Sequence, residues 1–209
     1  WVFHFASPAS PPHFERLNKE IMWVNSRGLD EALQAADHLR ARVIFASTSE
    51  VYGDPEVHPQ TEEYKGSVNC YGPRSMYDEA KRYAEALIYV YKNTYKVNTV
   101  VGRFFNTYGP RMDKNDGRVV SNFINQSIEG RDITIYGDGG QTRSFCYVDD
   151  LIEAIILLIN SHEEGPINLG NPTEFTIKEL ATIVQEMIPS ASKIVYAPLP
   201  GDDPMQRKP

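Results

Sequence analysis

The feature that most constrains the fold is a regular alternation of apolar runs with helical patterns along the chain. The apolar runs are short and cover residues 1–6, 42–47, 97–104, 133–136, 167–170 and 193–197. Between them, apolar residues recur at helical spacing over 16–38, 75–94, 119–129, 149–160 and 177–188. Strands that alternate with helices are typical of a parallel sheet covered by helices. We therefore predict an α/β protein with a Rossmann-like, doubly wound parallel sheet.

Composition and charge exclude several classes of protein. The 209 residues are 41% hydrophobic and 23% charged, which suits a globular protein with one substantial core and a smaller lobe. A net charge of −7 argues against non-specific nucleic-acid binding. The longest apolar run, 151–159, is too short to span a membrane. Cys70 and Cys146 match neither a metal spacing nor a disulfide framework, so we expect no metal and a cytoplasmic, reducing compartment.

Small hydroxyl residues and one glutamate follow the buried run 43–46, as Ser47, Thr48, Ser49 and Glu50. In an open α/β sheet, ligands bind at the carboxyl ends of the strands. These side chains are therefore expected to face a ligand.

A tyrosine and a lysine lie one helical turn apart, at Tyr77 and Lys81. A helix places both on one face. A free tyrosine has a pKa near ~10, and a cation close by favours the phenolate and lowers that value. We therefore expect Lys81 to make Tyr77 a base that removes a proton from a substrate hydroxyl while hydride leaves the same carbon.

Together these motifs resemble the extended short-chain dehydrogenase/reductases that act on nucleotide sugars, over nearly the whole chain. The matching segments are 3–6, 47–53, 77–81, 103–110 and 143–150. Four further segments are most similar to the UDP-glucuronate decarboxylase (UDP-xylose synthase) group: 7–12, 53–55, 115–120 and 202–209.

The resemblance implies a catalytic NAD and a UDP-sugar substrate. Besides Tyr77 and Lys81, which hold the nicotinamide ribose, the implied NAD contacts are Ala6, Ser7, Ala46, Ser47 and Thr107. The implied substrate contacts are Asn106, Arg118, Val119, Gln141, Arg143 and Arg207. Their arginines suit diphosphate and uridine, because guanidinium groups bind phosphate in two-point fashion.

The same resemblance implies a role for each catalytic residue. Tyr77 is the base and later the acid at the C4 hydroxyl, and Thr48 hydrogen-bonds that hydroxyl. Glu50, next to Ser49, orients the sugar ring or a water, and Arg143 steadies an enolate near the reacting ring.

The neighbours of Glu50 bear on the reaction class. A 4,6-dehydratase needs an acid to expel the C6 hydroxyl, and Ser49 is too weak an acid for that task. Decarboxylation of UDP-glucuronate to UDP-xylose through a transient 4-keto intermediate needs no such acid. A 4,6-dehydratase and a 4-epimerase remain alternatives, as does a truncated, inactive dimerisation partner.

The resemblance also implies a domain division. Residues 1–105, with 144–170 returning to them, correspond to part of an NAD-binding domain, and 106–143 with 171–209 correspond to a nucleotide-sugar-binding lobe. The family's glycine-rich phosphate loop is not in this sequence. We expect that loop to precede Trp1, which leaves a Golgi lumenal form open.

A homodimer is implied as well, paired through the helices at 16–38 and 75–94. Apolar residues on these helices motivate the pairing: Ile21, Val24, Leu87 and Tyr91. The first of these helices departs from the family pattern at Trp23 and Val24, before Asn25.

Overall fold

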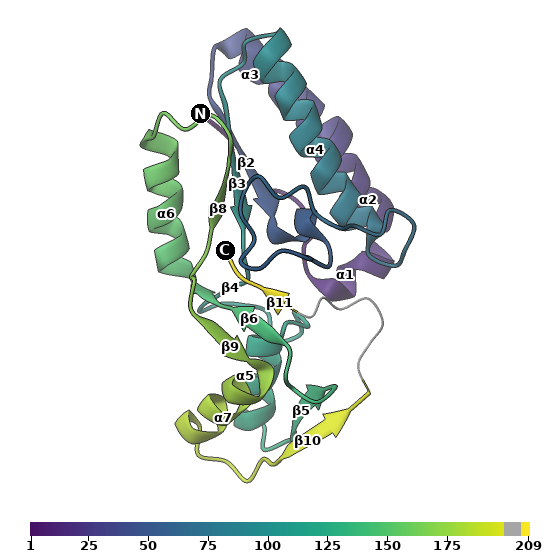
Figure 1. Cartoon of the computed structure of the whole chain (residues 1–209), viewed down its shortest axis with the longest axis vertical. Coiled ribbons are helices and arrows are strands. Elements are labelled where there is room, and N and C mark those ends of the chain that lie inside the picture. The colour runs from purple at the N-terminus through teal and green to yellow at the C-terminus, as the bar shows by residue number, and fades with distance from the viewer. Residues whose placement is uncertain (199–205) are drawn as a thin grey trace.

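A parallel sheet of four strands forms one half of the molecule in the computed structural model, which describes residues 1–198 and 206–209 (Figure 1). The strand order is β1 (Val2–His4), β2 (Val43–Thr48), β3 (Thr99–Phe104) and β8 (Pro166–Leu169). All neighbouring pairs are parallel, so the carboxyl ends of β2 and β3 lie at the same edge. The predicted Rossmann-like sheet is confirmed.

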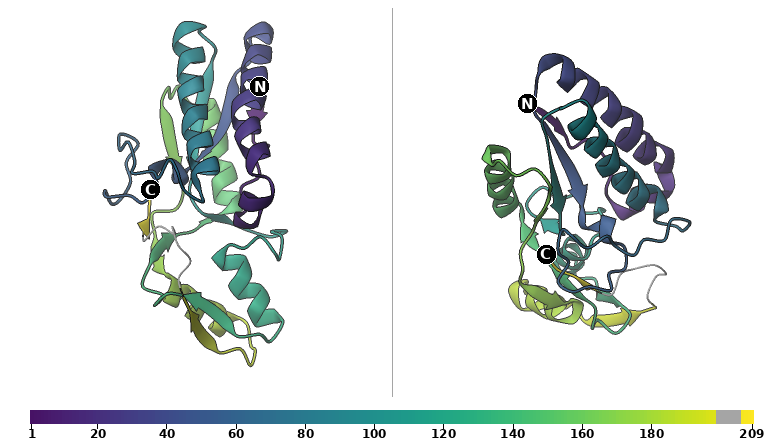
Figure 2. Two further views of the ribbon diagram at one scale, coloured as in Figure 1. Left: turned by 90° about the vertical axis from the view of Figure 1, so that its right-hand side faces the viewer. Right: turned by 45° about the horizontal axis from the view of Figure 1, so that its top comes forward.

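Helices cover both faces of this sheet. On one face lie α2 (Asn18–Trp23), α3 (Leu29–Leu39) and α4 (Ser75–Thr94), and on the other lies α6 (Val148–Asn160) (Figures 1 and 2). Side chains of β2 alternate between the two cores, as strand geometry requires. Val43 and Phe45 pack with α3 and α4, whereas Ile44 packs with α6.

A smaller lobe lies below the sheet. It contains α5 (Val119–Ile128) and α7 (Ile177–Met187), packed on the parallel pair β5 (Ile133–Tyr136) and β10 (Ile194–Ala197). Phe123, Ile133 and Val184 belong to its separate core. A capping box begins α7 at Thr176, since Thr176 and Glu179 bond each other's backbone amides.

Short strands that the sequence did not reveal connect the two halves. They are β4 (Thr107–Tyr108), β6 (Thr142–Ser144), β7 (Cys146–Tyr147), β9 (Glu174–Thr176) and β11 (Gln206–Arg207). The β6 strand lies between β11 and β9, and β4 pairs with β7. Elements of two or three residues are too short to show a hydrophobic period.

The helix expected over 16–38 is present from Asn18 to Leu39, but a π-helical turn interrupts its regularity. The segment forms α1 (Pro11–Arg16), α2, a π-helical turn η1 (Val24–Gly28) and then α3. Asn25 explains the interruption. Its side-chain Nδ2 donates to the Ile21 carbonyl oxygen at 2.8 Å. In a regular α-helix that carbonyl oxygen would accept from the Asn25 backbone amide instead.

Three of the four residues expected on a dimer face belong to the chain's own core. Ile21 is fully buried, and Leu87 and Tyr91 pack against the core beneath α3 and α4. Val24 is half-buried.

Within the described residues, no helix is long and apolar enough to cross a bilayer. The same residues contain no cluster of side chains suited to a metal ion.

Candidate active site

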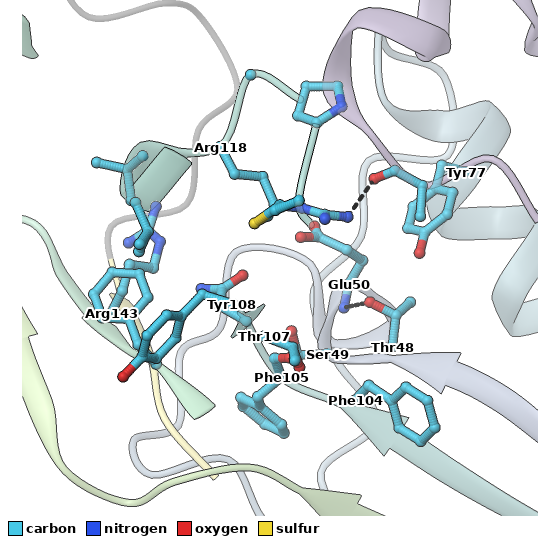
Figure 3. Close-up of a pocket in the computed structure, with 18 of the residues that line it drawn as sticks. Thr48, Ser49, Glu50, Tyr77, Phe104, Phe105, Thr107, Tyr108, Arg118 and Arg143 are labelled. Carbon is cyan, nitrogen blue, oxygen red and sulfur yellow. Dashed lines mark hydrogen bonds between the residues drawn. The ribbon is translucent and has the colours of Figure 1, made fainter. Parts of the chain in front are cut away.

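A cavity of about 640 Å³ lies between the carboxyl ends of β2 and β3 and the lobe. Most of the expected site residues line it, from both halves of the molecule (Figure 3). They are Ser7, Ala46, Ser47, Thr48, Ser49, Glu50, Tyr77, Lys81, Asn106, Thr107, Arg118, Val119, Gln141 and Arg143. Ala6 is exposed and is not among the residues that line this cavity, so its contact with NAD stays a prediction. Phe5 and Ser7, its two neighbours, line the cavity instead.

The end of β2 becomes a tight turn that holds the hydroxyl residues and Glu50 in place. Strand β2 ends at Thr48, and the 3-10 turn η2 runs over Ser49–Tyr52. The Thr48 side chain caps this turn, because its Oγ1 accepts a hydrogen bond from the Glu50 amide at 3.2 Å. Glu50 therefore enters the cavity directly above Thr48 (Figure 3).

Tyr77 lies in the first turn of α4, where the cavity meets the sheet. Its ring stacks on Phe14, with centroids 5.0 Å apart, and the Thr48 side chain acts on its hydroxyl. Burial and the Glu50 charge raise the pKa of Tyr77 to about 12, against smaller opposing effects of Thr48 and Arg118.

The expectation that Lys81 lowers the Tyr77 pKa is wrong for this structure. The Lys81 Nζ donates to the Ala46 carbonyl oxygen at 2.7 Å and lies 5.9 Å from the Tyr77 ring centroid. Burial lowers the pKa of Lys81 itself to about 7, opposed by the Glu85 charge. A buried lysine that is only partly protonated near neutrality is a weak source of positive charge for its neighbour.

Arg118 is the arginine whose charge acts on Tyr77. It stands at the start of α5, and its Nη2 donates to the Ala9 carbonyl oxygen at 3.0 Å, which ties the lobe to the loop after β1. Arg118 points toward Glu50 and Tyr77 in Figure 3.

Arg143 lies on the opposite side of the cavity, on β6, where it donates to the Thr142 carbonyl oxygen (Figure 3). Its expected position beside the reacting group at Tyr77 is therefore wrong. The position of Arg143 suits a part of the substrate that is distant from the reacting carbon. Arg207 pairs with Arg143 through the backbone of β11, and its side chain lies outside the described part of the structure.

The residues around Tyr77 and Lys81 fit one half of a dinucleotide. The Ala46 and Ser47 positions at the end of β2 and Thr107 on β4 line the same wall. Lys81 presents a buried Nζ next to this wall and would hold the nicotinamide ribose. The family's phosphate loop is not in this sequence, so these residues fit the nicotinamide and its ribose alone.

Three residues of the site region escaped the sequence reasoning. Phe14 stacks on Tyr77, Arg74 binds Glu50, and Asn25 donates to Ser7 Oγ at 2.9 Å. Phe14 and Arg74 carry no spacing signal. The signal for Asn25 was a polar residue on the buried face of an amphipathic segment, which predicts a side chain with a specific partner.

A model of the NAD dependent epimerase/dehydratase family matches residues 1–170. Among curated proteins, the chain is 49% identical over 208 residues to UDP-glucuronic acid decarboxylase 1 from Xenopus tropicalis. That match covers 100% of this chain and 49% of the relative, so the chain spans about half the length of that protein.

Solved structures show the same architecture. UDP-glucose 4-epimerase from Thermotoga maritima, determined with UDP-glucose, superposes with a TM-score of 0.90 at 27% identity, over 99% of this chain and 67% of that one. UDP-glucose 4-epimerase from Thermus thermophilus, determined with NAD, gives a TM-score of 0.85 at 30% identity, over 99% and 68%. Since the family model covers most of the chain and the fold agrees, the chain belongs to the NAD dependent epimerase/dehydratase family.

Proposed function

We propose that the full-length protein is an NAD-dependent lyase that converts UDP-glucuronate to UDP-xylose and carbon dioxide. The observation that carries this proposal is the arrangement around Tyr77: its hydroxyl meets Thr48, and Glu50 and Arg118 act on it from the two halves of the cavity. The identity to the Xenopus decarboxylase supports the reaction class. So does Ser49, which stands where a dehydratase requires a stronger acid.

The chemistry divides between the cofactor and the chain. NAD, when bound, supplies the acceptor for hydride from C4 and returns that hydride at the end of the cycle. Tyr77 removes the C4 hydroxyl proton, and Thr48 orients that hydroxyl. The resulting 4-keto acid loses its C6 carboxylate as carbon dioxide, and the enolate takes a proton from solvent at C5, through a water that Glu50 orients. Tyr77 finally returns its proton to the C4 oxygen.

In this proposal Arg118, and not Arg143, steadies the enolate near the reacting ring. Its guanidinium is held between Ala9 and Asp116, close enough to Tyr77 to act on that hydroxyl. A fixed cation there favours both a C6 carboxylate and an enolate oxygen. Arg143, across the cavity, is then placed for the diphosphate, with the backbone of β11 beside it. The lobe that carries both arginines, 106–143 and 171–209, is the proposed nucleotide-sugar-binding part.

The test is to incubate the full-length protein and NAD with UDP-glucuronate or UDP-glucose and to follow the products by NMR. We expect UDP-xylose and carbon dioxide from the first, without added oxidant, and no 4-keto-6-deoxy sugar from the second. Formation of UDP-galacturonate would make the protein an epimerase, and a 4-keto-6-deoxy product from UDP-glucose would make it a dehydratase. If the protein neither turns over these substrates nor binds NAD, the alternative of an inactive dimerisation partner is supported.

A homodimer is also proposed, with different residues at its face. Helices α2 and α4 stand side by side (Figure 2), and they carry exposed apolar side chains that a partner would bury. These are Met22, Trp23, Tyr83, Tyr89 and Val90. Sedimentation of the full-length protein should show a dimer that Trp23→Glu weakens. Tyr71→Glu, at a residue 95% exposed on a loop, should leave the dimer intact.

A further inference from the structure

Arg74 binds the carboxylate that acts on Tyr77. It precedes α4, and its Nη2 donates to Glu50 Oε2 at 2.8 Å. Both side chains are partly shielded, with exposures of 25% and 19%. Shielding of this degree makes the pairing of the two charges stronger than it would be on an open surface.

Arg74 also contacts the ring that stacks on Tyr77. Its guanidinium carbon lies 5.5 Å from the Phe14 ring centroid, and the Phe14 and Tyr77 rings are 5.0 Å apart at an interplanar angle of 22°. Arg74 and Tyr77 therefore both contact Phe14. A cation near an aromatic ring is held there by the ring's quadrupole.

A third link runs through the backbone. The Arg74 carbonyl oxygen accepts hydrogen bonds from the Tyr77 and Asp78 amides, at 3.0 and 3.1 Å, and so begins the helix. A side-chain substitution keeps these two bonds, because they involve only the main chain. The effect of the guanidinium can thus be tested separately from the start of α4.

We propose that Arg74 is a positioning residue for Tyr77, which it serves by holding the Glu50 carboxylate and by supporting the Phe14 ring against the tyrosine. The expected effect of Arg74 on turnover rests on the proposed function. The expected effect of Arg74 on the ionisation of Tyr77 does not.

The charged groups around Tyr77 give the direction of the effect. Glu50 and Asp78 disfavour the phenolate, and Arg118 favours it. Lys81 lies near the ring and donates to Ala46. Arg74 offsets the charge of Glu50. Without its guanidinium, the Glu50 charge opposes phenolate formation more strongly.

The experiment compares Arg74→Gln with the wild-type, full-length protein. The pH at which turnover of UDP-glucuronate is half-maximal should rise by about half a unit to one unit. A rise of one unit lowers the phenolate fraction, and the rate at neutral pH, about tenfold. Arg74→Lys retains the charge and should recover most of the shift. NAD affinity should stay unchanged.

A second measurement needs no turnover. Tyrosinate absorbance, followed against pH as the difference between each protein and the same protein carrying Tyr77→Phe, reports the ionisation of Tyr77 alone. Its midpoint should rise in Arg74→Gln and fall in Glu50→Gln. In the double variant with Glu50→Gln, loss of Arg74 should add little, because the charge that Arg74 offsets is gone.

The matched control is Arg82→Gln. Arg82 lies on the same helix and donates to the Val51 and Lys65 carbonyl oxygens, so it supports the same turn without pairing with Glu50. Its substitution should lower the melting temperature and leave both midpoints unmoved.

The possible outcomes separate the two proposals. A wild-type protein inactive on UDP-glucuronate, with the absorbance shift present, would reject the proposed function and retain the role of Arg74. Unchanged midpoints in Arg74→Gln, with or without a loss of melting temperature, would show that Arg74 only anchors α4 and would overturn the inference. If Arg74→Gln does not fold, an unchanged midpoint in Glu50→Gln would overturn it equally.

Discussion

Glu85 on α4 and Arg103 on β3 form a two-point ion pair directly behind the end of β2. Arg103 Nε and Nη2 donate to the two carboxylate oxygens at 3.0 and 2.6 Å. Ser47 Oγ donates to the same carboxylate at 2.6 Å. Arg103 also donates to the Tyr52 hydroxyl at 2.8 Å. The cavity wall that carries the site is thus fastened to the sheet and to α4 by one largely buried polar network.

Arg103→Met should lower the free energy of unfolding by about 3 kcal/mol, because it removes the two-point partner of the Glu85 carboxylate in a shielded place. Urea denaturation measures this change. Arg131→Met removes a cation from an exposed pair with Glu129 and should cost less than about 1 kcal/mol. Equal costs for the two variants would show that the Glu85 pair contributes no more than a surface pair.

Tyr77→Phe should lower kcat by about 10² to 10⁴, because proton transfer at the sugar hydroxyl loses its base. NAD binding, followed by titration calorimetry, should be largely retained, since the ring still stacks on Phe14 and Lys81 is unchanged. Tyr83→Phe alters an exposed tyrosine of the same helix and should leave kcat as it is. Near wild-type turnover by Tyr77→Phe would remove Tyr77 from the mechanism.

The pH dependence of stability should reveal the buried Lys81. Its pKa is about 7 in the folded chain, against ~10.4 when unfolded, so the unfolded chain binds one more proton between these values. The free energy of unfolding of the wild type, minus that of Lys81→Met, should therefore rise as the pH goes from about 7 to 10. Denaturant titrations at several pH values give this difference. A flat difference would mean that Lys81 stays protonated in the folded state.

Gly53→Ala should be strongly destabilising. Gly53 has a φ of +64°, and an added Cβ would lie 1.9 Å from the Ser67 carbonyl oxygen, where the loop pairs back onto the turn after β2. The matched control is Gly130→Ala, at a φ of +68° with no atom within 4 Å of the added Cβ. A positive φ costs an L-residue about 1 to 2 kcal/mol or more at both sites, and the clash adds about 1 to 3 kcal/mol at Gly53 alone. Equal melting temperatures would contradict the close approach of the two segments.

The sequence by itself determined the elements that build the sheet and the residues at its carboxyl edge. Hydrophobic period is a local property, and it located the ends of β2, β3, α4 and α6 to within two residues. Two local patterns predicted residues of the cavity wall. One is the run Ser47 to Glu50 directly after a buried strand, and the other is the helical spacing of Tyr77 and Lys81.

Only the tertiary structure decided the electrostatics of that wall and the division of labour between the arginines. Burial raises the Tyr77 pKa and lowers that of Lys81, and burial depends on residues far apart in the chain. Arg118 reaches Tyr77 because the lobe folds back onto the loop after β1, whereas Arg143 remains across the cavity. Phe14, Arg74 and Glu50 come from separate parts of the sequence and meet only in the folded chain. Charge and desolvation act through space, so no local pattern in the sequence carries them.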